Sequence, residues 1–346
     1  MDNSYYILAK EQIEIKRLHI CTWEFPNDPS YIEYGMEFSY DSFSGNSLEL
    51  YLAVPFVKKG DKVICLLNNL SNKANSRFIF NDVVIGNDNV GKDERDGSIL
   101  KFEKRDALTI LPCEITADNG LILFKIKKPQ KHEGNLYFRV LVKLGMNKVA
   151  FRKKGIAQIS YIYDFKINET RNLPDNIYKI KDDNGLEICK VKQFFCLHAV
   201  PDDFILSFVD SSKLKNIRKL ETEAFQRYLP DIKSISKDCY NIMFLKDSDK
   251  ESYSIFSICT EETIGSKQIA LAIGASIICN LLFALSSLRF TKDKNIDWYL
   301  QIPLEYWISF AIFSILGCFL FCHTKYKWIG SFLSLIFLTL IYIVLN

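Results

Sequence analysis

Charged side chains are scarce in the last part of this 346-residue chain. Residues 263–346 contain six basic and three acidic side chains, whereas residues 1–262 contain 38 of each sign. Collagenous, low-complexity and broadly disordered chains have too few apolar side chains to offset the entropy of ordering, and the 48% hydrophobic content excludes these classes. The composition therefore predicts two unlike parts, one of ordinary soluble composition without net charge and one that is strongly apolar.

Three apolar runs make up the second part. They cover residues 268–288, 303–322 and 328–345. At about 1.5 Å per residue, each run would span a hydrocarbon core of roughly 30 Å as a helix. Three of the four tryptophans flank these runs, as expected for rings that prefer the headgroup zone. The sequence therefore predicts three C-terminal transmembrane α-helices within residues 263–346.

The first residues of the chain lack the apolar core of a secretory signal. Lysine and arginine are divided equally between the two sides of the predicted bundle, so their distribution does not indicate an orientation. The missing secretory signal therefore decides the expected orientation. We expect a multi-pass protein of the cell (inner) membrane, with the N-terminal domain cytoplasmic and the C-terminus outside. Seven of the ten cysteines lie in the soluble part without a C-x-x-C pair, which argues against a disulfide framework and agrees with a reducing compartment.

Apolar and polar residues alternate with a period of two through the first 168 residues, which is typical of strands with one buried face. The alternation predicts strands at residues 48–54, 136–144, 159–167, 13–22, 32–40, 62–67, 77–80, 107–111 and 120–127. Gly- and Asn-containing turn sequences separate them, and no βαβ alternation appears, which argues against a Rossmann-like or P-loop domain. We therefore expect a mainly β domain at residues 1–168, an antiparallel sandwich or barrel.

Residues 169–262 have a different pattern and predict a small α+β membrane-proximal segment. A polar stretch at 168–185 predicts a linker or a long loop, and apolar residues at helical spacing predict a helix over about 212–229. Strands are expected at 193–200, 240–245 and 252–259. About six residues separate the last strand from the first apolar run, and such a short connector can transmit a rigid-body movement.

Catalytic motifs are absent from the soluble part, which contains three histidines and no G-x-S-x-G or H-E-x-x-H sequence. Residues 86–93 match the first part of a phosphate-binding loop, but Asp93 stands where Ser or Thr must hold magnesium, so we interpret them as a hairpin loop. Cys196 and His198 lack a zinc-site spacing and are interpreted as core residues. The sequence assigns no catalytic residue, no metal and no cofactor, and we expect no enzymatic activity.

Residues 125–154 contain ten basic side chains and one acidic side chain. Residues 19–57, in contrast, contain six acidic side chains and no Lys or Arg. Either neighbouring strands pair these charges, or the basic run forms an anion-binding face for a nucleotide, a nucleic acid or anionic lipid headgroups. Because the soluble part is neutral overall, general nucleic-acid binding is unlikely and a local phosphate pocket is favoured. The candidate residues are Lys125, Lys127, Lys128, Arg139, Arg152, Lys153 and Lys154.

Small and polar residues recur every four positions in the first apolar run, at Ala272, Ser276, Asn280 and Ala284. Small residues let helices approach closely and an asparagine in hydrocarbon seeks a partner, so this stripe predicts a helix-contact face. The contact forms either within the three-helix unit or between subunits of a homo-oligomer. No charged residue lies in the middle of any run, which argues against a secondary transporter.

This layout resembles that of bacterial membrane effectors in which a sensor domain controls oligomerising spanning helices, although no motif carries the resemblance. The leading hypothesis is a β-rich module that senses a phosphate-bearing small ligand or a protein partner and controls a membrane-perturbing bundle, either pore-forming or depolarising, in a defence-type response. The alternative is a membrane-tethered interaction scaffold whose helices act only as an anchor. A membrane-associated enzyme is a third, weaker option.

Overall fold

The computed structural model describes residues 4–262 except 26–28, 55, 119, 145–148, 156–157, 172 and 237–238, together with Ala272 and Ser276. The described residues of 1–153 and 160–261 form one compact unit. Ala272 and Ser276 are helical, while the predicted spans otherwise lie outside the described residues. No helix in the described part of the chain is long and apolar enough to cross a bilayer.

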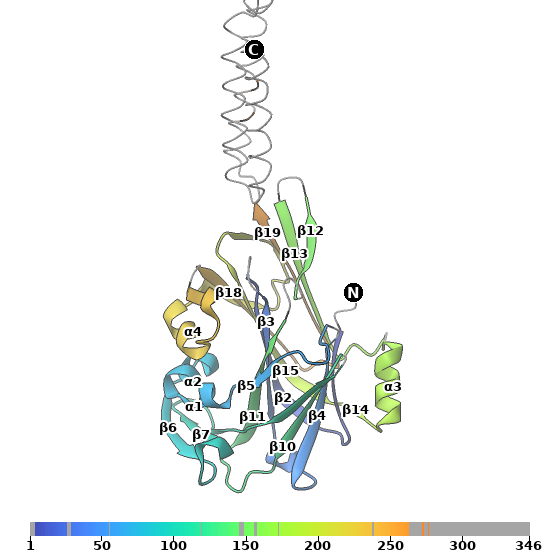
Figure 1. Ribbon diagram of the computed structural model, residues 1–346, viewed down its shortest axis with the longest axis vertical. Coiled ribbons are helices and arrows are strands. Elements are labelled where there is room, and N and C mark those ends of the chain that lie inside the picture. Colours follow the sequence, from blue (N-terminus) through green and yellow to red (C-terminus); the bar gives the residue numbers. More distant parts are fainter. Residues whose placement is uncertain are drawn as a thin grey trace, which may run out of the picture. The chain divides into compact units, whose positions relative to one another are not determined.

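Two sheets contain all the strands of the described residues (Figure 1). The nine-stranded sheet consists of β1 (Ser4–Ala9), β4 (Ser47–Ala53), β9 (Glu114–Asp118), β10 (Leu121–Lys127), β12 (Phe151–Lys154), β13 (Gln158–Ile167), β14 (Glu187–Ile188), β16 (Phe204–Val209) and β19 (Tyr253–Glu262). Its order is β16-β19-β13-β1-β4-β10-β9, with β12 beside β13 and β14 beside β1.

The ten-stranded sheet lies in the same unit. It consists of β2 (Glu14–Trp23), β3 (Tyr31–Phe38), β5 (Val63–Cys65), β6 (Val84–Asn89), β7 (Ser98–Phe102), β8 (Leu108–Ile110), β11 (Asn135–Lys143), β15 (Lys190–Pro201), β17 (Leu214–Lys219) and β18 (Tyr240–Ser248). Its order is β17-β18-β15-β2-β3-β11-β8-β7-β6, with β5 beside β11.

Four short α-helices lie among the strands. Their bounds are α1 (Leu67–Ser71), α2 (Lys73–Phe80), α3 (Asp175–Asp183) and α4 (Thr222–Tyr228), and 3₁₀ turns occur at Tyr40–Ser42, Glu94–Asp96 and Lys233–Ser236. The described part of the chain is therefore mainly β, as the alternation predicts.

The two sheets pack face to face as a sandwich, because aromatic rings from one sheet meet those of the other. Phe124 of β10 lies 5.0 Å from Phe138 of β11 between ring centroids, and Tyr163 of β13 lies 4.9 Å from His198 of β15. His198 is buried and its Nδ1 lies 2.6 Å from the Thr22 hydroxyl, so its interpretation as a core residue is confirmed. Side chains of alternate strand positions fill this interior.

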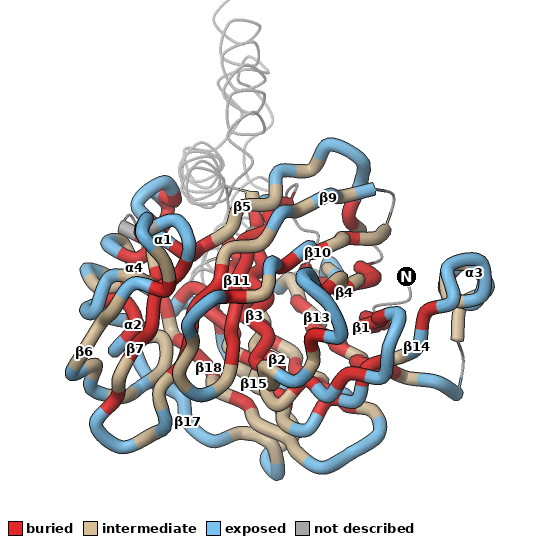
Figure 2. The backbone as a smooth tube through the Cα atoms, turned by 90° about the horizontal axis from the view of Figure 1, so that it is seen from below, coloured by how far each residue is buried: buried red, intermediate tan, exposed pale blue. Residues whose placement is uncertain are grey.

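Helices pack on the outer face of each sheet. Helices α1, α2 and α4 pack on the outer face of the ten-stranded sheet, where the Trp23 ring meets Phe225 of α4 edge-on at 4.8 Å. Helix α3 packs on the opposite flank, with Ile177 against Tyr6 and Leu8 of β1 (Figure 1). Figure 2 shows the consequence: the central strands β2, β3 and β11 are largely buried.

The expected division near residue 168 is wrong. Strand β15 pairs in parallel with β2 from Lys190↔Glu14 to Ala199↔Trp23, and β19 lies beside β13 in the other sheet. Residues 169–262 therefore complete both sheets instead of forming a separate segment. The sheets are also mixed rather than antiparallel, because β1–β13, β8–β11 and β2–β15 are parallel pairs.

The helix expected over 212–229 is wrong in its first half. Residues 214–219 form strand β17, which pairs with β18, and only Thr222–Tyr228 is helical. Leu214 and Ile217 fit a helical spacing, but the exposed edge of β18 offers backbone partners, so tertiary pairing overrides the local pattern.

Three further local predictions can be compared with the structure. The strand expected at 77–80 is the end of α2, because a run of three apolar residues does not distinguish a strand from a helix. The polar linker expected at 168–185 contains α3. Residues 86–93 lie in the β6–β7 hairpin, which confirms their interpretation as a hairpin loop.

Candidate functional site

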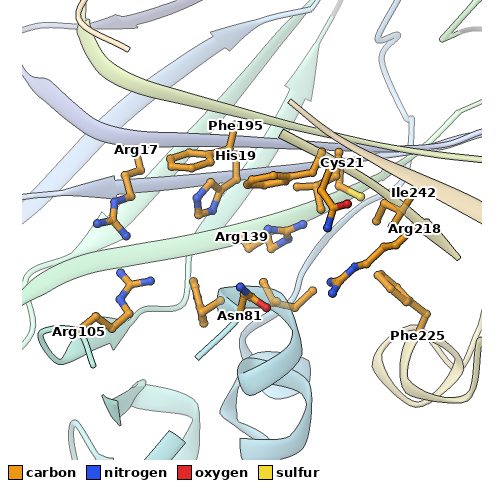
Figure 3. A pocket seen from close by; sticks show the side chains of 15 residues that line it. Arg17, His19, Cys21, Asn81, Arg105, Arg139, Phe195, Arg218, Phe225 and Ile242 are labelled. Atoms are coloured by element: carbon orange, nitrogen blue, oxygen red, sulfur yellow. The ribbon is translucent and has the colours of Figure 1, made fainter. Parts of the chain in front are cut away.

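A cavity of about 190 Å³ opens on the outer face of the ten-stranded sheet. It is lined by residues of β2, β11, β15, β17 and β18, of the end of α2, of the β7–β8 loop and of α4. Four arginines line it: Arg17, Arg105, Arg139 and Arg218. Figure 3 shows Arg17 and Arg105 at one end, Arg218 at the other and Arg139 between them.

Strand alternation places the β2 side chains in this cavity. Arg17, His19 and Cys21 point to the outer face, whereas Leu18 and Ile20 are fully buried on the other side of the strand. The pattern that predicts a strand here therefore also predicts that Arg17 and His19 share a face.

Gly35 of β3 makes room beside His19. It lies opposite His19 on β2 and opposite Arg139 on β11. A Cβ at Gly35 would overlap the Tyr137 hydroxyl, so only glycine lets that side chain lie across β3. The Tyr137 hydroxyl accepts a hydrogen bond from Arg139 Nη1 at 3.1 Å and lies 3.0 Å from His19 Nδ1.

Glu33 of β3 fixes Arg139 beneath the helices. Its carboxylate accepts hydrogen bonds from Arg139 Nε at 2.6 Å, Trp23 Nε1 at 2.7 Å and the Tyr228 hydroxyl at 2.7 Å. Burial lowers the pKa of Arg139, but the Glu33 carboxylate raises it, and the net pKa lies well above the ordinary value. Arg139 is therefore a fixed positive charge that lines the cavity.

Glu37 of β3 is shared by two other arginines. Its carboxylate accepts a hydrogen bond from Arg105 Nη2 at 3.3 Å and lies 3.7 Å from Arg17 Nε. The Arg105 guanidinium also lies 5.0 Å from the centroid of the Phe102 ring, a cation–π contact. Two arginines are thus held in place while their charges are only half compensated.

The cavity carries an excess of positive charge. Four arginines lie in it against the two carboxylates of Glu33 and Glu37, and no acidic side chain among the described residues lines it. Arg218 has no ion pair within the described part of the chain. Burial, followed by the charges of the neighbouring arginines, holds the pKa of His19 well below its usual range. An anion is the ligand that this arrangement favours.

Arg139 is the one candidate of the predicted basic run that lines the cavity. Lys127 pairs with Glu114 at 3.0 Å, Lys128 lies over the Tyr40 ring at 4.8 Å, and Lys125 is exposed on β10. The basic run therefore does not form one anion-binding face, and strand-to-strand pairing accounts for Arg139 and Lys127.

The remaining basic candidates lie on β12. Lys153 and Lys154 are exposed, whereas the Arg152 guanidinium donates to the Tyr161 hydroxyl at 2.8 Å. That hydroxyl donates to Glu261 at 2.6 Å, which links β12, β13 and β19. Burial raises the pKa of the nearby Glu24 to about 7, and the Arg152 charge opposes that rise. Arg152 therefore belongs to a polar cluster that links three strands.

The predicted helix-contact stripe is described only in part. Ala272 and Ser276 are helical, while Asn280 and Ala284 lie outside the described residues. The stripe stays a prediction.

Three arginines and His19 were not singled out by the sequence. Arg17 and His19 share one face of a predicted strand, and this periodicity could have marked them. Arg105 comes from a loop and Arg218 from a segment expected to be helical, so no local pattern brings them together.

Comparison with models of known protein families gives no match, and comparison with curated proteins gives none either. The function is therefore argued from the chemistry of the cavity.

Proposed function

We propose that residues 1–262 form a sensor module that takes a small anion in the arginine-lined cavity and thereby controls three transmembrane helices. The observation that carries the proposal is the excess of four arginines over two carboxylates in a cavity without an acidic lining residue among those described. The helices are those predicted at residues 268–288, 303–322 and 328–345.

Preorganised arginines support anion binding. Glu33 and Glu37 hold three of the guanidinium groups before a ligand arrives, so little side-chain entropy is lost on binding. The fourth, Arg218, is exposed and supplies a charge from the opposite wall. A charge-assisted hydrogen bond from each guanidinium would make anion binding strong and salt-sensitive.

The course of the chain supports coupling to the membrane part. Strands β17 and β18 contribute Arg218, Ile242 and Phe244 to the cavity. Residues 249–252 then connect β18 to β19, which ends at Glu262, six residues before the first predicted span. A movement of β17 and β18 towards a bound anion has a short covalent route to that span.

On this proposal the protein is a membrane effector with its sensor module on the cytoplasmic side of the inner membrane. Subunits associate through the stripe of Ala272, Ser276, Asn280 and Ala284, and the bundle perturbs the bilayer in a defence-type response. The alternative, a tethered scaffold, needs neither the excess charge of the cavity nor the short connection to the first span.

Membrane potential in cells expressing the full chain tests the proposal. Arg218→Gln removes an exposed cavity charge that has no ion pair among the described residues, and Lys215→Gln on the same strand is the matched control. We expect depolarisation by the full chain and by Lys215→Gln, a marked loss in Arg218→Gln, and none in Asn280→Leu.

Equal depolarisation by all four proteins contradicts the proposal. Depolarisation by none of them also contradicts it and favours the scaffold. In that case, exchange of the three helices for an unrelated anchor of the same topology is expected to preserve function.

A further inference from the structure

The cavity has two chemically different walls. Arg17, Arg105 and Arg139 with His19 form a basic wall, and mostly apolar side chains form the other, with Arg218 at its end. The Phe195 and Phe244 rings lie 6.0 Å apart between centroids, with Phe225, Leu197 and Ile242 completing the apolar wall. A ligand that fits both walls carries an anionic group at one end and an apolar ring at the other.

The size of the cavity limits that ligand. Its 190 Å³ exceeds the roughly 150 Å³ of a cavity that binds benzene and falls short of the roughly 300 Å³ at which drug-sized pockets begin. A single ring with one anionic substituent fits this range.

The direction and number of positive charges favour a phosphate group over a carboxylate. Arg17 comes from β2, Arg105 from the β7–β8 loop and Arg139 from β11, whereas Arg218 of β17 lies at the other end of the cavity. Donors that approach from several elements match the oxygens of a tetrahedral phosphate, whereas a carboxylate accepts its donors in one plane. The excess of two positive charges also equals the charge of a phosphomonoester dianion.

His19 is the residue of the basic wall that contacts the apolar wall. Its Nδ1 lies 3.0 Å from the Tyr137 hydroxyl, and its ring meets Phe195 edge-on at 5.1 Å between centroids. The charged and titratable groups on the elements around it are Arg17 and Cys21 of β2, Glu33 and Glu37 of β3, Tyr137 and Arg139 of β11, Arg105 of the β7–β8 loop, Arg218 of β17, Lys246 of β18 and Tyr228 of α4. Burial, followed by the charges of Arg139, Arg105 and Arg17, lowers the pKa of His19 and keeps the imidazole neutral while no anion is bound.

We infer that the cavity binds a phosphomonoester carrying a small ring, and that binding places a proton on His19. The inference rests on the proposed anion-sensing function. A bound dianion cancels the charge of the arginines, so the imidazolium becomes favourable and pairs with the phosphate. The proton comes from the buffer, and no covalent bond forms or breaks.

Calorimetry of the full chain in phosphatidylcholine nanodiscs tests this inference. Phenyl phosphate, inorganic phosphate and benzoate are titrated near neutral pH in buffers of different ionisation enthalpy. The dependence of the binding enthalpy on the buffer gives the number of protons taken up. We expect phenyl phosphate to bind about tenfold tighter than inorganic phosphate, because its ring is buried on the apolar wall. We also expect it to bind about tenfold tighter than benzoate, which is a planar monoanion, and to take up a net proton.

Two variants test whether His19 is the group that takes up the proton. His19→Gln is expected to bind phenyl phosphate more weakly without proton uptake, while His132→Gln keeps both, since His132 stacks on Tyr40 at 3.8 Å outside the cavity lining. If His19→Gln fails to fold, Arg218→Gln serves instead, since Arg218 is exposed. It should lose about tenfold in affinity and retain the proton uptake.

The outcomes separate the inference from the proposed function. Binding of none of the three anions overturns both. Binding without proton uptake, proton uptake that persists in His19→Gln, or benzoate as tight as phenyl phosphate overturns the inference alone. Nanodiscs containing phosphatidic acid, a phosphomonoester without a ring, add a further outcome: competition with phenyl phosphate overturns the inference alone, and its absence supports a soluble ligand with a ring.

Discussion

Removal of the Glu33 charge is the sharpest test of how the ten-stranded sheet is held together. Glu33 is fully buried and accepts three hydrogen bonds, one of them from Arg139, which is 2% exposed. Glu33→Gln would leave that guanidinium buried without a carboxylate. Breaking a buried pair in this way costs about 3–5 kcal/mol. At about 2–4 °C per kcal/mol for a domain of this size, the midpoint of thermal unfolding should fall by roughly 10 °C.

Thermal unfolding of the full chain in nanodiscs, followed by circular dichroism, measures this loss. Glu49→Gln is the matched control, because Glu49 pairs with Lys10 at 3.4 Å on the surface and such pairs contribute less than about 1 kcal/mol. The double variant Glu33→Leu/Arg139→Met removes both charges and should be more stable than Glu33→Gln. A midpoint for Glu33→Gln equal to that of Glu49→Gln would refute the reasoning.

Three further predictions concern other parts of the sandwich. Gly35→Ala should lower the free energy of unfolding by about 2 kcal/mol and abolish anion binding, because the alanine Cβ would overlap a neighbouring tyrosine hydroxyl. Gly45→Ala is the control, since its Cβ meets open space and its midpoint of thermal unfolding should equal that of the wild type. Burial raises the pKa of the Glu24 carboxyl from 4.5 to about 7. The resulting contribution to the free energy of unfolding, about 3 kcal/mol, is complete below pH 4.5 and is lost as pH rises through 7. Glu24→Gln should flatten this pH dependence of stability in denaturant titrations. A hydrogen bond from Cys113 lowers the pKa of Cys65 to about 6, so near pH 7 iodoacetamide should modify Cys65 about tenfold faster than in Cys113→Ala, as mass spectrometry would show.

Strand prediction succeeds where one face of a sheet meets the core and the other meets solvent. Residues 48–54 and 159–167 alternate clearly and form β4 and β13 of the nine-stranded sheet. Outward positions such as Glu49, Asp164 and Lys166 are polar, and α3 is the helix that packs on part of this outer face in the described chain. Periodicity reports such a difference between faces directly.

The same rule fails on the ten-stranded sheet. Tyr137 and Arg139 break the apolar run of β11 and read as solvent-facing, yet both are buried beneath the helices. Their burial depends on Glu33 and Gly35 of β3, which lie about a hundred residues earlier in the chain. A single sequence contains no local pattern that predicts such a distant partner.

Prediction of the site fails for a related reason. The basic run from Lys125 to Lys154 is dense in sequence, but strand alternation and the sheet order spread its members over β10, β11 and β12. The cavity instead collects Arg17, Arg105 and Arg218, which lie far apart from one another in the sequence. Charge density along a chain therefore predicts a charged surface only where neighbouring residues also share a face.

The free cavity is where binding energy can be converted into movement. Four guanidinium groups around two carboxylates repel one another, and an anion removes that repulsion. Strand β17 is an edge strand with an irregular register between Leu214 and Asn216, so it is held less firmly than the central strands. An anion at a hundred times its Kd stabilises the bound form by about 2.7 kcal/mol, enough to shift a weakly held edge strand between two positions. Because β17 lies on β18, and β18 leads into β19, the edge that carries Arg218 is the element through which we propose that the cavity acts on the membrane helices.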